Sequence, residues 1–229
     1  TLVLNRIGGL LLSHASTTGR VTSEPASNGT SLSLTLATSG IIDCTSVNPL
    51  LPPGTGGQIV IASPINEIGG SRSITKTGTG TLYLQNGTNT YTGTTTVNAG
   101  SLALDDLGTI GDGNNTLFLA GGNLQSGATR SGSSAAQKAI PNPVVLTSDA
   151  YIYSSTGTTN STRYLPLSGT ISGPGVLKIA NPATVVGNSF IVRLYNPTLI
   201  LSNTIVVGES TGAYADNIFA SPPNTSTLQ

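Results

Sequence analysis

The feature that most constrains this chain is a short alternating pattern inside residues 73–104 that recurs within about thirty residues. Two leucine pairs about twenty residues apart each flank a single residue; they are Leu82-Tyr83-Leu84 and Leu102-Ala103-Leu104. Successive side chains of a β-strand point to opposite faces, so the leucines are predicted to point inward, and Tyr83 and Ala103 outward. A period of two nested in a period near twenty predicts a β-solenoid, in which each coil pairs the sheet edge left by the previous one.

Similar apolar alternations, bounded by Gly, Asn, Ser or Pro, continue from Leu2-Val3-Leu4 to Ile205-Val206-Val207. The only plausible helical turn is at 133–139. Two stretches break the alternation, near residues 49–57 and 126–143, and they are predicted to be loop excursions. We therefore expect an all-β, right-handed parallel β-helix that carries these two loops.

An antiparallel sandwich or barrel is the alternative for so many short strands. Asn86-Gly87 has the composition of a hairpin turn, but the Thr-Asn-Thr-Tyr that follows it is a poor antiparallel partner for residues 82–84. The recurrence at about twenty residues favours the solenoid, and it predicts on the order of ten coils.

One domain, residues 1–220, is predicted, followed by a tail or linker at 221–229 that has no apolar periodicity. The chain starts at Thr1 and contains no Met, so we expect it to be a segment of a longer or processed protein. It has no apolar run of membrane-spanning length, so no membrane span is expected in this segment.

Residues 73–104 also resemble a known family. The segments Lys76-Thr-Gly-Thr-Gly-Thr-Leu-Tyr-Leu84 and Asn89-Thr-Tyr-Thr-Gly-Thr-Thr-Thr-Val-Asn-Ala-Gly-Ser-Leu102 are similar to the autotransporter-associated β-strand repeat. That repeat reads approximately L-x-K-x-G-x-G-x-L-x-L followed by N-x-Y-x-G-x-T-x-V-x-x-G-x-L. A weaker echo lies at residues 167–179, without the lysine and the Tyr-x-Gly half. The resemblance implies a right-handed parallel β-helix in a secreted or surface-exposed bacterial protein.

The composition restricts the class of partner. Charged residues make up 8% of the chain, and nine basic residues balance nine acidic ones, so the positive surface that nucleic acid requires is missing. The 37% of apolar residues cluster as strand-like alternations, which argues against disorder. Cys44 is the single cysteine, so no intrachain disulfide can form, and it is expected to be a small buried hydrophobe.

A polysaccharide-cleaving site on a β-helix needs carboxylates that converge on one face. Asp105 and Asp106 are the only adjacent acids, and neighbours on a strand point to opposite faces. A solvated turn is therefore the expectation at this place. His14 is the sole histidine and has no recognisable nucleophile and acid partners, so a solvated histidine is expected.

Three further motifs have ordinary structural explanations. Asp112-Gly113-Asn114 faintly resembles a calcium loop but lacks the alternating acids and the closing Glu of an EF-hand. Gly78-x-Gly80 is followed by no helix that would present amides to a phosphate. Sequons begin at Asn28, Asn86, Asn114, Asn160 and Asn224, and turn chemistry explains them. No cofactor, metal or catalytic residue is predicted.

Tyrosines are distributed along the chain, at Tyr91, Tyr151, Tyr153, Tyr164, Tyr195 and Tyr214 among others. They can stack on sugars, as an adhesin requires, or can ladder along a sheet and cap the core. From the sequence we expect a non-catalytic structural or adhesive protein outside the cell or on the bacterial surface, with self-association and surface glycans as candidate partners. The alternatives are a filament subunit that polymerises end to end, and a carbohydrate-active β-helix enzyme or a protein similar to a phage tailspike.

Overall fold

The computed structural model describes residues 2–4, 33–45, 57–105, 107–127, 139–154, 162–180, 189–194, 198–202, 205–207 and 217–220. Regular structure in these ranges is β-strand throughout, without a helix. Among the same residues there is accordingly no apolar helix of bilayer-spanning length. Residues 133–138 of the predicted helical turn, residues 49–56 and 128–138 of the two predicted excursions, and the predicted tail at 221–229 lie outside the described residues.

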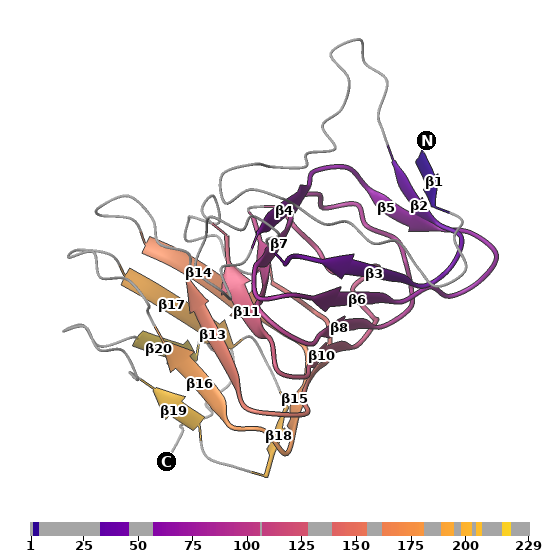
Figure 1. Cartoon of the computed structure of the whole chain (residues 1–229). Coiled ribbons are helices and arrows are strands. Elements are labelled where there is room, and N and C mark those ends of the chain that lie inside the picture. The colour runs from indigo at the N-terminus through magenta and orange to yellow at the C-terminus, as the bar shows by residue number, and fades with distance from the viewer. Residues whose placement is uncertain are drawn as a thin grey trace.

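Two seven-stranded sheets, in which all pairing is parallel, form most of the described molecule (Figure 1). The first sheet contains, in spatial order, β3 (Gly40–Asp43), β6 (Ile74–Thr77), β8 (Thr95–Val97), β10 (Leu117–Leu119), β12 (Val144–Leu146), β15 (Ile171–Gly173) and β18 (Leu199–Leu201). The second contains β4 (Gln58–Ile61), β7 (Thr81–Leu84), β9 (Ser101–Leu104), β11 (Asn123–Ser126), β13 (Ala150–Ser154), β16 (Leu177–Ala180) and β19 (Ile205–Val207).

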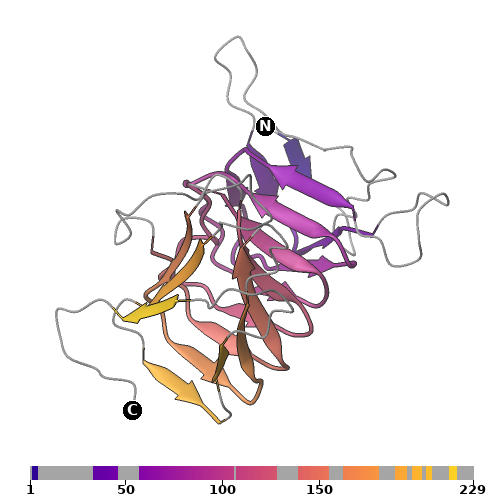
Figure 2. The same ribbon diagram turned by 90° about the vertical axis from the view of Figure 1, so that its left-hand side faces the viewer.

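A third side of the molecule carries two short parallel sheets. The first contains β1 (Leu2–Leu4), β2 (Leu34–Leu36) and β5 (Ile65–Glu67); the second contains β14 (Thr162–Leu167), β17 (Ser189–Leu194) and β20 (Asn217–Ala220). Successive strands along the chain therefore visit successive sides, and each strand pairs with its counterpart one turn of chain later. Figure 2 shows the resulting stack of rungs advancing from the N-terminal to the C-terminal end. This arrangement is consistent with a β-solenoid.

The core follows from the alternation in each strand. Pairing in the second sheet aligns six aliphatic side chains that are each no more than 1% exposed; they are Ile59, Leu82, Leu102, Leu124, Ile152 and Ile179. Leu84, Leu104 and Val97 are equally buried. The predicted inward orientation of Leu82, Leu84, Val97, Leu102 and Leu104 is thus confirmed. Apolar side chains that stack from strand to strand in this way form a continuous hydrophobic core.

The register confirms the outward position predicted for Ala103, but the residue is not exposed there. Ala103 occupies an outward register position between Tyr83 and Gln125, yet it is fully buried. Gln125 is itself only 6% exposed. An alanine side chain is short, and larger neighbours one strand spacing away on each side shield it. Alternation therefore assigned the correct face of the strand but not the correct burial.

The length of chain per turn varies. Thr81 pairs with Ser101, as the period of about twenty predicts, whereas Leu177 pairs with Ile205 and Gly40 with Ile74. Longer connections therefore occur at both ends of the stack. Within the described residues each long sheet has seven strands, fewer than the ten or so coils expected of the whole chain.

The weak echo at 167–179 contributes strands β15 and β16 to the same two long sheets as strands β6 and β7 of the strong repeat. Continuous pairing through the first sheet brings Gly173 into the column that contains Lys76. The Gly173-x-Gly175 of the echo is therefore displaced by two residues relative to Gly78-x-Gly80.

Candidate functional site

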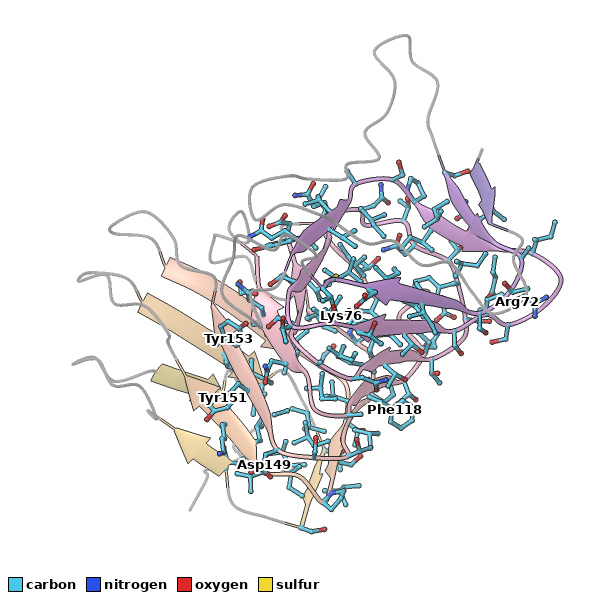
Figure 3. All side chains as sticks on the ribbon, viewed as in Figure 1. Arg72, Lys76, Phe118, Asp149, Tyr151 and Tyr153 are labelled. Atoms are coloured by element: carbon cyan, nitrogen blue, oxygen red, sulfur yellow. The ribbon has the colours of Figure 1, made fainter. Side chains whose placement is uncertain are left out.

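Lys76 is the most unusual side chain of the described core. It follows Ile74 by two residues, so strand alternation directs it inward, and the register places it between Ile42 and Val97. The residue is fully buried. Its Nζ donates hydrogen bonds to the backbone carbonyls of Thr77 (3.0 Å), Gly78 (2.6 Å) and Ala99 (2.8 Å). Figure 3 places the side chain within the body enclosed by the strands.

Burial lowers the pKa of Lys76, and the neighbouring Cys44 and Asp43 partly oppose this effect. No ion pair to Lys76 is found among the described residues, so backbone carbonyl dipoles satisfy the ammonium group. A buried ammonium is tolerated only when its donors are paired. The family motif includes the lysine but does not indicate that its ammonium group is buried. The Ile74-x-Lys76 alternation does indicate it, because residues two apart on a strand face the same side.

Glycines create the space for the ammonium group. Gly100 has φ +63°, and a Cβ there would lie 2.6 Å from Lys76 Nζ. Gly78 also has a positive φ, of +76°, while a Cβ on Gly80 would collide with the backbone of Gly57 and Cys44. The Gly-x-Gly pair therefore serves turn geometry and close packing between coils.

Cys44 is fully buried beside this corner, which confirms the prediction of a small buried hydrophobe. Burial raises the pKa of its thiol to about 11; the positive charge of Lys76 lowers that pKa and Asp43 raises it. A thiol with so high a pKa is almost entirely protonated at neutral pH and is a poor nucleophile.

Asp105 is not in a solvated turn, so that prediction was wrong. It is 5% exposed, and its Oδ2 accepts a hydrogen bond from Nε2 of Gln85 on the preceding coil. A Cβ on Gly127, from the following coil, would collide with the Asp105 carboxyl group. Three successive coils therefore enclose this acid. Asp106 and His14 lie outside the described residues.

The Asp112-Gly113-Asn114 motif forms a compact turn. Oδ1 of Asp112 accepts hydrogen bonds from the backbone N–H groups of Asn114 (2.9 Å) and Asn115 (3.2 Å), and its Oδ2 accepts one from Asn114 Nδ2 (3.3 Å). These bonds, led by that from the Asn114 N–H, lower the pKa of Asp112. The described residues contain no group of three or more His, Cys, Asp or Glu arranged to hold a metal ion.

Asn86 begins one of the sequons and also makes a local turn. Its Oδ1 accepts hydrogen bonds from the backbone N–H of Thr88 (2.7 Å) and from Thr88 Oγ1 (2.6 Å). Its Nδ2 donates to the carbonyl of Ala62 on the preceding coil (3.0 Å). The turn chemistry expected for the sequons is thus present at Asn86 and Asn114, whereas Asn28, Asn160 and Asn224 lie outside the described residues.

The tyrosines divide between core and surface. Tyr91 is fully buried, its hydroxyl lies 2.8 Å from Thr95 Oγ1, and burial raises its pKa to about 12. Tyr153 is hydrogen-bonded to the hydroxyl of Ser101. Lys178 lies 5.3 Å from the ring centroid of Tyr151 and 3.7 Å from Asp149. Figure 3 shows Tyr151 and Tyr153 on β13 and Asp149 directly before that strand. Tyr164, Tyr195 and Tyr214 have no described side chain.

Asparagines hold together the part of the third side that lies between its two sheets. Asn89 accepts a hydrogen bond from the Ile65 N–H (2.9 Å) and donates one to the carbonyl of Thr109 (2.8 Å). Asn142 donates to the carbonyl of Ile110 (3.0 Å) and to Oδ1 of Asn115 (2.8 Å). All three asparagines are at most 5% exposed. Side-chain amides thus replace the backbone ladder where β5 and β14 are not continuous.

A pocket of about 370 Å³ opens over this interruption. Three consecutive coils line it, through residues 87–89, 107–113 and 139–142. Its walls combine apolar side chains, among them Leu107, Ile110 and Ile140, with the carboxylate of Asp112 and two of the asparagines.

Fold and site together define a protein of stacked parallel β-coils with a polar, charge-poor surface. A family model for the passenger-associated-transport-repeat matches residues 74–104, which span β6 to β9 and include Lys76, Gly78, Gly80 and Gly100. The match confirms the resemblance inferred from the sequence, and it implies a passenger of the autotransporter type associated with the cell surface. No curated protein and no solved structure matches the chain.

Proposed function

We propose that this chain is a right-handed β-helical segment of a bacterial surface passenger, with a structural or adhesive role and no catalysis. The observation that carries the proposal is the passenger repeat at 74–104, whose four strands belong to the two long parallel sheets. Right-handedness is supported by the strong preference of parallel β-crossovers for that hand. A continuous ladder of paired strands resists bending, which suits a rigid spacer that displays loops away from the membrane.

The surface chemistry supports the same proposal. Charged residues make up 8% of the chain, and on the outer side of the first sheet hydroxyl side chains of Ser39, Ser73 and Thr94 bond to neighbouring coils. Coils that are joined by hydroxyl groups do not depend on ion pairs that salt would screen.

Antibodies raised against this chain test the location of the protein. Intact cells of the source organism should bind them without permeabilisation, and external protease should remove the signal. A cytoplasmic marker serves as the control for cell integrity. Labelling that appears only after permeabilisation would contradict the proposal.

A second candidate role, a filament subunit that polymerises end to end, is favoured by the C-terminal edge of the first sheet. β18 ends that sheet, and its outward Ile200 is 62% exposed. Among the described residues no strand pairs with its free edge, and such an edge with an exposed isoleucine is a template for another strand. Sedimentation of the isolated chain should reveal linear species that grow with concentration and that Ile200→Lys reduces. A clean monomer at high concentration would eliminate this role and leave the surface proposal untouched.

A further inference from the structure

The two long sheets differ in how far their outer faces are covered. On the second sheet the outward residues Val60, Ala103 and Gln125 are at most 6% exposed. On the first sheet every residue of the central outward column is partly or fully exposed, from Ile41 (40%) on the first strand to Ile200 (62%) on the last. The first sheet therefore offers the more accessible face to another molecule.

This central outward column contains one residue from each of the seven strands, aligned by continuous parallel pairing. Its apolar members are Ile41, Phe118, Val145 and Ile200, and its hydroxyl members are Thr75, Thr96 and Ser172. None of the seven is charged, and Phe118 occupies the middle strand, β10. Figure 3 shows the Phe118 side chain on the outer side of the stack.

The positions on either side of this column are uncharged with one exception. Two residues earlier in the sequence, six of the seven strands carry Ser or Thr and the other carries Pro143. Two residues later, Asp43 is the only charged residue, and its Oδ1 accepts hydrogen bonds from the hydroxyl groups of Thr45 (2.8 Å) and Thr77 (3.0 Å). Because few charged groups would lose water, covering this face costs little desolvation energy.

The order of residues in the column complements a second copy of the same column. An isologous contact places one surface of two identical chains face to face about a two-fold axis. If the axis runs along the stack, each residue meets its own copy. If it runs along the strands, the first strand meets the seventh, so that Ile41 meets Ile200 and Thr75 meets Ser172. In both arrangements Phe118 lies opposite the partner's Phe118, and aromatic pairs of this kind attract each other.

The area of the face is that of a weak dimer. Seven strands spaced about 4.8 Å apart, with outward positions over about 15 Å of each strand, give about 500 Å² per copy and about 1,000 Å² in total. Specific interfaces begin near this size, and an aromatic residue at the centre contributes a large share of the binding energy. We therefore expect a dissociation constant of about 10–100 µM.

We propose that the outer face of the first sheet binds the same face of a second copy of this chain, with Phe118 against the partner's Phe118. This contact joins two stacks side by side and closes at two copies, whereas the free edge of β18 would join stacks end to end. The inference goes beyond the surface role proposed above and does not depend on it, because the face is the same wherever the chain is located.

Analytical ultracentrifugation of the purified chain at concentrations up to about 1 mM measures this association, and a monomer–dimer equilibrium is expected. Phe118→Thr introduces a residue type already present in the column and should weaken dimerisation about tenfold or more. Ile200→Thr, at the end of the column, should weaken it about two- to fivefold. Ile68→Thr is the matched control, because Ile68 is a similarly exposed isoleucine (59%) outside the two long sheets, and it should dimerise as the native chain does.

Two charged variants test whether Phe118 meets its own copy. Phe118→Lys and Phe118→Glu each place like charges opposite one another, so each variant alone should stay monomeric at concentrations where the native chain dimerises. An equimolar mixture of the two should dimerise again, because opposite charges then meet. A loss of internal stability would not be restored by mixing. Circular dichroism melts establish that each variant is folded.

A native chain that stays monomeric at the highest concentration would overturn the proposal. Dimers that Phe118→Thr weakens no more than Ile68→Thr would also do so, as would a mixture of the charged variants that sediments no faster than either alone. Species larger than a dimer that persist in Phe118→Glu would indicate end-to-end assembly in place of the side-by-side contact. A failure here would leave the surface location unaffected, because the antibody experiment reports on that separately.

Discussion

Replacing Lys76 by methionine is the sharpest test of how the passenger repeat is stabilised. Methionine keeps an unbranched apolar stem of similar length but removes the three hydrogen bonds that Nζ donates. The Thr77 carbonyl retains a second partner, the N–H of Cys44 at 3.0 Å. The carbonyls of Gly78 and Ala99 lose the hydrogen bond from the ammonium group in a corner that is only partly buried.

Each buried carbonyl that is left unpaired costs about 1–3 kcal/mol. The removal of a buried charge recovers part of this cost, because desolvation of the ammonium group is itself unfavourable and is what lowers its pKa. Because water can partly reach the two freed carbonyls, the net expectation is that Lys76→Met lowers the free energy of unfolding by about 1–3 kcal/mol. Lys76→Ala should be worse, since it also leaves a cavity where the stem packed.

Urea unfolding followed by circular dichroism provides the measurement, with Lys178→Met as the matched control. Lys178 also lies on a strand of a long sheet, but it is partly exposed and pairs with Asp149 at the surface. Its substitution should change the free energy of unfolding by less than about 1 kcal/mol. If Lys76→Met were as stable as Lys178→Met, the ammonium group would not hold the corner, and our explanation of the repeat's lysine would be refuted.

Three further predictions concern the core, the thiol and catalysis. Leu84→Asp should reduce the free energy of unfolding by several kcal/mol, about 4, because it buries an unpaired carboxyl group, whereas Ile68→Asp at an exposed position should change the melting curve little. The raised pKa of Cys44, about 11 in the folded chain, means that stability is complete below the thiol's ordinary pKa of 9.0 and is lost as pH rises toward 11; Cys44→Ala should flatten that decline, measured by unfolding at pH 8 to 11. Incubation with pectin, alginate and glucans should release no reducing ends, and release that is abolished when Asp105 and Asp106 are both replaced by Asn would show an enzyme instead.

Much of the core was predictable because strand alternation is local. The parity of Leu82, Leu84, Leu102 and Leu104 is set by neighbours in the sequence, and their recurrence after about twenty residues indicates that the strands stack in parallel. On its own strand Lys76 lies two residues after the apolar Ile74, so alternation in the sequence also indicates its inward position. Alternation does not indicate its three carbonyl partners, because they depend on how two turns and a neighbouring coil close around it.

The sequence alone determined the class of fold, the inward face of the central strands and the passenger repeat at 74–104. Only the tertiary structure decided which residues of different coils lie side by side. The burial of Asp105 beneath Gln85 and the amide contacts of Asn142 with Asn115 depend on the length of each connection, which varies from coil to coil. The course of each connection decides which turn residues of neighbouring coils meet, and no local pattern in the sequence reports that course.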